Sequence, residues 1–296
     1  MLELTNLCNL RCVMCGIWSE RPHVSIDLDE FQGLLEQRTV RNVPVLALTG
    51  GEPFMMGDFE EYYRRAAAAS PRSHINISTN GWYVDRTLEL LARVDRRRIS
   101  VTISYDGVRS HDAVRRVAGS GQRLLATATG IRRRYPEVPL SLKMTVTNDN
   151  HGEILDTARQ CRDLDIPFRF KTLEKLRCHQ SRSPSDIDGP EYDDAILRSI
   201  TEQGEAVLGL GIETNAQYIR ALISKNTTGC APCSCSPRTL FVGVDGNVFL
   251  CRRKDPIGNV RRQPLDEIWR SASKRERVSE MATCPGPPLG LGFVND

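Results

Sequence analysis

The sequence lacks the features that mark membrane and exported proteins. Its longest apolar runs, such as Val43–Leu48, are far shorter than the roughly 18 residues that a membrane-spanning helix requires. Glu3, Asn6 and Arg11 interrupt any apolar core of the kind that a signal peptide needs. We therefore expect a cytoplasmic protein with no membrane partner.

An excess of charge of one sign is also missing. The chain has 40 Lys and Arg residues against 37 Asp and Glu residues, a net charge of +3, so no nucleic-acid-binding surface is indicated. Apolar residues make up 40% of the 296 residues, which is too many for a disordered chain. This length fits one large domain with a small appendage.

Cysteine, in contrast, is plentiful. Ten cysteines in a chain with no export signal favour metal binding or redox chemistry over a disulfide framework. They gather near both ends of the chain: Cys8, Cys12, Cys15, Cys161, Cys178, Cys230, Cys233, Cys235, Cys251 and Cys284. The two clusters are therefore the first candidates for functional sites.

Short apolar segments alternate with helical patterns over the first part of the chain. The predicted strands are Leu2–Thr5, Pro44–Thr49, His74–Thr79, Ile99–Ser104, Leu140–Val146 and Pro167–Leu173. The predicted helices are Asp27–Arg38, Asp58–Ala69, Val84–Val94, Gln122–Arg134 and Gly152–Cys161, with Asp27 and Asp58 as N-caps and Glu30 and Glu61 as their capping-box partners. This alternation predicts an α/β fold with a parallel sheet, and the short, evenly spaced strands favour a partial (β/α)6 TIM-like barrel.

The pattern changes in the last third of the chain. We expect three units: a partial barrel over 1–180, a helical linker over 181–225 and a small C-terminal domain over 226–296. The elements predicted there are a loop at Arg177–Pro190, a helix at Glu191–Glu205, a hairpin of Arg238–Val244 and Asn247–Cys251 with a type I′ turn at Asp245-Gly246, and a helix at Leu265–Met281.

The N-terminal cysteines form the motif C-x3-C-x2-C directly after the first predicted strand. Cys8, Cys12 and Cys15 lie on so short a loop that their thiolates can converge on one metal centre. Four cysteines would saturate a [4Fe–4S] cluster, whereas three leave one iron open, as a catalytic centre requires. A structural zinc site is the alternative.

This loop resembles that of the radical S-adenosylmethionine (SAM) superfamily. The resemblance extends to Gly50-Gly51-Glu52-Pro53, Thr79-Asn80-Gly81 and Ser104-Tyr105-Asp106-Gly107, which follow the second, third and fourth predicted strands. It implies that the three cysteines hold a [4Fe–4S] cluster whose fourth iron chelates SAM. Reductive cleavage of SAM in that family gives methionine and a 5′-deoxyadenosyl radical, which abstracts a substrate hydrogen.

The same resemblance implies a SAM site at the carboxyl ends of the strands, where barrel active sites are assembled. Gly50 and Gly51 can let the backbone approach the ligand closely, and Glu52 can accept a hydrogen bond from the SAM amino group. Ser104 resembles the residue that meets the SAM ribose or carboxylate, and Asn80 is a further candidate beside the same ligand.

Two charge features leave alternatives open. Arg115 and Arg116 can pair with a carboxylate or form a solvated helix face. Between Asp186 and Glu213, eight acidic residues stand against one basic residue, Arg198, which can complement a cationic substrate or again form a solvated face.

The C-terminal cysteines resemble the SPASM and twitch extensions of radical SAM enzymes. Cys235 and Cys251 flank the predicted hairpin, which brings its two ends together, and Cys284 is a plausible remote ligand. The spacing seen in that family favours Cys230 over Cys233 as the fourth ligand of one auxiliary [4Fe–4S] cluster, with a zinc ribbon as the alternative. Cys233 then remains as a spare thiol and a candidate catalytic hydrogen-atom donor.

Three enzymatic reactions compete. We favour epimerisation of a small polar substrate, such as an amino-sugar or aminoglycoside-like intermediate in antibiotic biosynthesis, with Cys233 returning the hydrogen. A dehydrogenase of a small alcohol and a maturase of a ribosomally made peptide are the alternatives, and a start directly at the first strand counts against the maturase. The expected cofactors are SAM and two [4Fe–4S] clusters, and the expected partner is an external electron donor such as flavodoxin or ferredoxin. An iron–sulfur electron carrier or zinc-binding interaction module would not need the SAM-site motifs.

Overall fold

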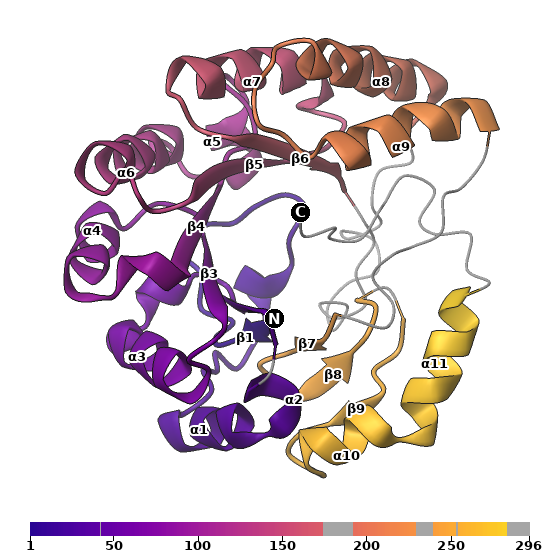
Figure 1. The fold of residues 1–296 in the computed structure, drawn as a ribbon. Coiled ribbons are helices and arrows are strands. Elements are labelled where there is room, and N and C mark those ends of the chain that lie inside the picture. The colour runs from indigo at the N-terminus through magenta and orange to yellow at the C-terminus, as the bar shows by residue number, and fades with distance from the viewer. Residues whose placement is uncertain (42, 174–191, 229–238, 253, 283–296) are drawn as a thin grey trace.

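Six parallel strands form an incomplete ring with helices around its outside (Figure 1). The computed structural model describes residues 1–41, 43–173, 192–228, 239–252 and 254–282. The strands of the ring are β1 (Leu2–Glu3), β2 (Val45–Thr49), β3 (His74–Thr79), β4 (Ile99–Ser104), β5 (Leu140–Val146) and β6 (Phe168–Thr172), and they are neighbours in chain order. The predicted α/β fold with a partial barrel is confirmed.

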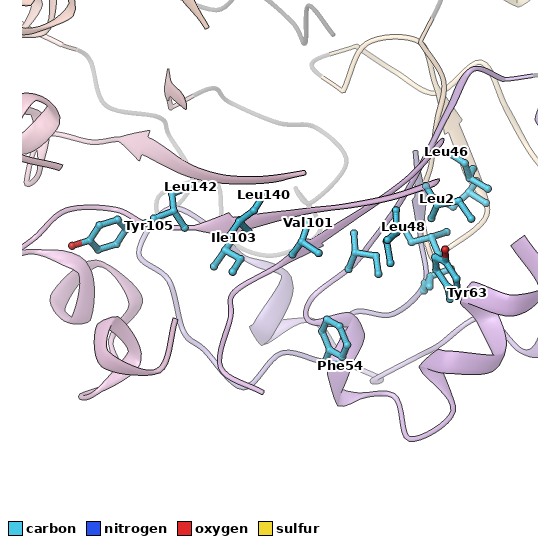
Figure 2. Packing of buried hydrophobic residues seen from close by; sticks show 14 of the residues in the cluster. Leu2, Leu46, Leu48, Phe54, Tyr63, Val101, Ile103, Tyr105, Leu140 and Leu142 are labelled. Atoms are coloured by element: carbon cyan, nitrogen blue, oxygen red, sulfur yellow. The ribbon is translucent and has the colours of Figure 1, made fainter. Parts of the chain in front are cut away.

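Helices cover the outer face of this ring because each of the strands β2 to β6 buries every second residue against them. Leu46, Ile75, Val101 and Leu142 belong to this buried set, which forms the main core (Figure 2). The helices are α1 (Leu28–Glu36), α2 (Arg38–Arg41), α3 (Phe59–Ala69), α4 (Val84–Arg93), α5 (His111–Arg115), α6 (Ser120–Arg134), α7 (Ile154–Asp163), α8 (Asp194–Leu208), α9 (Ala216–Thr228), α10 (Leu265–Arg270) and α11 (Ala272–Ala282). Within the described ranges, none of these helices is long and apolar enough to cross a membrane.

The inner face of the ring carries polar side chains among apolar ones, which distinguishes it from a closed barrel filled with branched apolar side chains. A cavity of about 1400 Å³ occupies this space, and Asn76, Ser100, Thr102 and Ser141 lie on its wall. Hydrogen bonds of 3.0 and 3.1 Å from the Asn76 amide to the Ser100 and Thr102 hydroxyls order part of this wall. The ring therefore encloses room for a polar molecule.

Three C-terminal strands extend the same sheet beyond β1. The extension is formed by β7 (Phe241–Val242), β8 (Asn247–Phe249) and β9 (Gly258–Asn259). β7 lies parallel to β1, and the other two continue in antiparallel order. The buried Glu3 carboxylate accepts a hydrogen bond of 3.0 Å from the amide of Val244, so β1 also fixes the turn of the hairpin.

Polar contacts attach the C-terminal helices to the first helices of the ring. Asp266 accepts hydrogen bonds from the amides of Arg38 and Thr39, at 3.0 and 2.8 Å, and thereby caps α2. Arg261 pairs with Glu30 at 2.8 Å. The predicted boundaries at residues 180 and 225 stay predictions.

Some local predictions are wrong in detail. Gly246 has φ of 82°, whereas Asp245 does not adopt a left-handed conformation, so the turn is not type I′. The amide of Gly246 donates to the carbonyl of Gly243, and Gly246 forms the left-handed position of a longer hairpin loop. The single helix expected over Leu265–Met281 is two helices, α10 and α11, separated at Ser271.

Of the two predicted N-caps, the structure shows one and not the other. Asp27 caps α1 through hydrogen bonds from the amides of Asp29 and Glu30, as expected. Asp58 makes no capping hydrogen bond to α3. The Glu30 side chain pairs with Arg261 rather than closing a capping box, because the C-terminal hairpin places a cation beside it.

Candidate radical SAM site

The structure brings together the carboxyl ends of the first four strands. The loop that carries Cys8, Cys12 and Cys15 follows β1, and the predicted SAM-site motifs follow β2, β3 and β4. Hydrogen bonds connect the motifs after β2 and β3 to each other and to the chain around the cysteine loop, and Arg115 connects the motif after β4 to Cys12. The four sequence motifs therefore form one site at one edge of the sheet.

The cysteine loop is held against the end of α5. The amides of Arg11 and Val13 donate to the carbonyls of Arg115 and Val114, at 3.1 and 2.9 Å. All three cysteines of the loop are free thiols, with Cys12 buried and the other two half-buried. Burial raises the pKa of the Cys8 and Cys12 thiols, so a metal that binds them must displace their protons.

The three thiols of the loop are a donor set that suits a four-iron cluster. In the described part of the chain, no three Cys, His, Asp or Glu side chains converge closely enough to hold one metal ion. A zinc site needs all its donors within about 2.3 Å of one point, whereas each cysteine of a [4Fe–4S] cluster binds its own iron. The buried amide nitrogen of Asn9, next to Cys8, has no partner among the described residues and can donate to a bound group.

Gly50 and Gly51 approach another segment of the chain rather than an open space. The Gly51 amide donates to the Thr5 carbonyl at 2.7 Å, and the Glu52 amide donates to the Leu7 carbonyl at 2.7 Å. A Cβ atom at Gly51 would lie 2.1 Å from the Leu7 oxygen, and one at Gly50 would lie 2.5 Å from the Thr5 oxygen. The close approach that the glycines permit is therefore to the chain between β1 and the cysteine loop, and their contact with SAM stays a prediction.

Glu52 connects the ends of β2 and β3. Its fully buried carboxylate accepts hydrogen bonds from the Thr79 hydroxyl at 2.7 Å, the Asn80 amide at 2.7 Å and the Phe54 amide at 3.1 Å. Burial raises the pKa of Glu52 to about 7 in spite of these three donors. Because a carboxylate has about four acceptor positions, one position remains for the predicted SAM amino group.

Asn80 links β3 to the cysteine loop. Its side-chain amide donates to the Asn9 side chain at 2.9 Å, and its side-chain oxygen accepts from the Trp82 amide at 2.9 Å. Ser104 is half-buried at the last position of β4. The structure places Asn80 beside the cysteine loop, and the predicted contacts of Asn80 and Ser104 with SAM stay predictions.

Arg115 lies behind the cysteine loop and is not part of a solvated helix face. It is 8% exposed, and its guanidinium forms an ion pair of 2.5 Å with the fully buried Asp106. Another guanidinium nitrogen donates to the sulfur of Cys12 at 3.3 Å. Asp106 belongs to a motif that the sequence singled out, but no local signal indicates its pairing with a residue nine positions later.

The auxiliary site is described only at Cys251. This cysteine follows β8 and lines the cavity of the ring, so one predicted ligand faces the space where a substrate could bind. Cys230, Cys233, Cys235 and Cys284 lie outside the described residues. Their predicted roles as ligands, and that of Cys233 as hydrogen donor, stay predictions.

The cavity wall does not match the expectation of a cationic substrate. Glu213 is the one member of the acidic segment, within its described part, that lines the cavity, and it lies 3.4 Å from Arg169. Lys143 and Lys171 add positive charge to the wall. Asp186, Asp188 and Glu191 lie outside the described residues. The described wall therefore favours a neutral or anionic group.

Comparison with known families gives two matches along the chain. Residues 2–168 match the radical SAM superfamily, and residues 230–285 match an iron–sulfur cluster-binding domain, SPASM. These matches confirm the predicted cofactors, which are SAM and [4Fe–4S] clusters. The SPASM match implies that the clusters include an auxiliary one.

Curated relatives resemble nearly the whole chain. The sporulation killing factor maturation protein SkfB of Bacillus subtilis is 28% identical over 96% of this chain and 67% of its own length. An AdoMet-dependent heme synthase of Methanosarcina barkeri is 26% identical over 91% of this chain and 81% of its own length.

Solved structures share the fold. SuiB of Streptococcus suis, bound to the precursor peptide SuiA, superposes with a TM-score of 0.69 at 15% identity, covering 92% of this chain and 64% of SuiB. The enzyme anSMEcpe, with bound AdoMet and a peptide, gives a TM-score of 0.66 at 15% identity, covering 96% of this chain and 83% of the other. The present chain thus spans less than two thirds of the length of SuiB.

Proposed function

This chain belongs to the radical SAM superfamily and contains a SPASM-type domain, and from this premise we propose that it modifies a peptide. When bound, SAM and the cluster supply a 5′-deoxyadenosyl radical that abstracts hydrogen from a substrate carbon. The residues of this chain bind the cofactors, exclude water and position the substrate.

The observation that carries the proposal is the cavity inside the ring. Its volume of about 1400 Å³ exceeds the roughly 300–1,000 Å³ of ordinary small-molecule pockets. The cavity extends from the amino ends of the strands, at Pro44, Pro139 and Pro167, to Ser78 of β3, which immediately precedes the buried Thr79-Asn80 pair of the candidate SAM site. A substrate segment in the cavity can thus present a carbon to the edge of the sheet where SAM is expected.

The chemistry of the wall suits a peptide. Asn76, Ser100, Thr102 and Ser141 offer hydroxyl and amide groups that can hydrogen-bond a backbone, and Lys143 adds a cation. The relative with 28% identity is named as a maturation protein, and two solved structures of this fold hold peptides. Together they favour a peptide over the small amino-sugar that the sequence alone suggested.

Epimerisation is the second candidate reaction. Five cysteines stand in or beside the C-terminal domain, and four suffice for one cluster, so one thiol remains to return a hydrogen atom. The preference for Cys233 as this donor rests on spacing alone. Epimerisation and dehydrogenation leave different products, so one assay can separate them.

The experiment incubates iron-reconstituted protein with SAM, a low-potential reductant and synthetic peptides that correspond to short reading frames beside its gene. Mass spectrometry of the peptides in deuterated water then reports the reaction. A loss of two hydrogens indicates oxidation or cross-linking, and uptake of a solvent deuterium without oxidation indicates epimerisation. Unchanged peptides alongside a modified amino-sugar or polyol would contradict the proposal.

A cavity-filling variant tests where the substrate binds. Ser141→Trp places a large side chain in the cavity, so peptide modification should fall at least tenfold while SAM cleavage continues without product. Thr129→Trp is the matched control, because Thr129 is exposed on α6. Equal activity of the two variants would place the substrate elsewhere.

A further inference from the structure

The Arg115 side chain contacts Cys12, a predicted ligand of the cluster. Arg115 is the last residue of α5, and its guanidinium bridges Asp106, at 2.5 Å, and the Cys12 sulfur, at 3.3 Å. Two of its nitrogens are thus engaged, and the buried Nε has no partner among the described residues. A cation with donor capacity to spare therefore lies against a ligand of the predicted cluster.

Holding the loop in place does not require this side chain. The main-chain hydrogen bonds from Arg11 to Arg115 and from Val13 to Val114 already attach the loop to α5. They use carbonyl groups, which any residue at position 115 retains. The buried guanidinium is expensive to desolvate, and Asp106 offsets that cost. An electrostatic role explains why a charged donor lies here.

Hydrogen bonds and positive charge beside cluster sulfurs favour the reduced form of an iron–sulfur cluster. Reduction adds one electron and makes the cluster and its thiolates more negative, and a nearby cation stabilises that charge. The effect is strong at this site because Arg115 and Asp106 are shielded from water.

We propose that Arg115 is a positioning residue that raises the reduction potential of the cluster held by Cys8, Cys12 and Cys15, through its hydrogen bond to Cys12. The electron comes from a low-potential one-electron donor protein of the flavodoxin or ferredoxin class. It enters the cluster without forming or breaking a covalent bond. The inference rests on the cluster of the family and is independent of the substrate.

The test compares Arg115→Met with Arg116→Met in iron-reconstituted protein without substrate. Arg116 is the adjacent arginine and is exposed, so it serves as the matched control. Potentiometric titration followed by electron paramagnetic resonance reports each reduction potential, and the relevant signal is the one absent from the Cys8, Cys12, Cys15 triple alanine variant.

Arg115→Met should make reduction at least tenfold less favourable, a shift of at least about 59 mV to lower potential. Arg116→Met should leave the potential unchanged, and Arg115→Lys should recover part of the shift because it keeps the charge. An unchanged potential in Arg115→Met overturns the proposal. The peptide assay is unaffected by that outcome, so the two proposals fail separately.

Removal of Arg115 alone leaves Asp106 buried without its cation, which can prevent folding. The double variant Asp106→Asn, Arg115→Met removes both charges and keeps the Asp106 Oδ1 acceptor for the Thr145 amide. It should still shift the potential downward, because the hydrogen bond to Cys12 is lost, but by less than Arg115→Met, since removal of the Asp106 charge favours reduction. In wild-type protein labelled with 15N-arginine, pulsed resonance should detect a nitrogen coupled to the reduced cluster, and absence of that coupling overturns the proposal without any variant.

Discussion

Replacing Gly51 by alanine tests whether the contact between the ends of β1 and β2 builds the site. The new Cβ would lie 2.1 Å from the Leu7 oxygen and 2.6 Å from the Leu7 carbonyl carbon. These are backbone atoms, so the chain must separate by more than about 1 Å to reach an ordinary contact of about 3.5 Å. Such a shift breaks the hydrogen bonds of the Gly51 and Glu52 amides, both 2.7 Å long.

The magnitude follows from these contacts. Overpacking costs about 1–3 kcal/mol, and two lost hydrogen bonds add about 0.5–1.5 kcal/mol each, a total of roughly 2–6 kcal/mol. Gly51→Ala should therefore lower the melting temperature by at least about 4 °C and reduce the iron bound after reconstitution. Gly57→Ala is the control, because a Cβ there meets nothing within 4 Å. A Gly51→Ala protein with wild-type melting temperature and iron content would refute the reasoning.

Three further predictions concern other parts of the chain. Because burial raises the pKa of Glu52 to about 7, its charge is lost below that pH, and SAM affinity measured by titration should fall about tenfold per pH unit there; a flat profile would separate Glu52 from the SAM amino group. Asp266→Ala removes hydrogen bonds from Arg38 and Thr39, so thermal unfolding should report a loss of about 1–2 kcal/mol, and unchanged stability would mean that this cap is unimportant. Cys233→Ala should keep both clusters and SAM cleavage but abolish solvent deuterium in the product; loss of the auxiliary cluster instead would make Cys233 a ligand.

The ring of strands could be predicted because its signals are local. The strands His74–Thr79, Ile99–Ser104 and Leu140–Val146 have the bounds expected from their alternating patterns. Helix α9 was missed even though Thr214 and Gln217 have capping-box spacing at its start. Strand β9 has only two residues and no local signal, and it forms by pairing with β8.

The candidate site likewise has parts that the sequence predicts and parts that only the structure shows. The cysteine loop is one short run of residues, and so is the motif that contains Glu52. The sequence alone therefore predicts both. The approach of Gly51 to Leu7 and the bridge from Asp106 through Arg115 to Cys12 join segments far apart along the chain. Such pairs depend on how the strand ends meet, and no local pattern carries that information.

The most direct test of the central claim is SAM cleavage by the reduced, iron-reconstituted protein. Chromatography of the reaction should show 5′-deoxyadenosine and methionine in equal amounts. The triple variant Cys8→Ala, Cys12→Ala, Cys15→Ala should form neither product and should hold about four irons fewer. Cleavage that persists in the triple variant, or no cleavage by fully iron-loaded wild-type protein, would contradict the account.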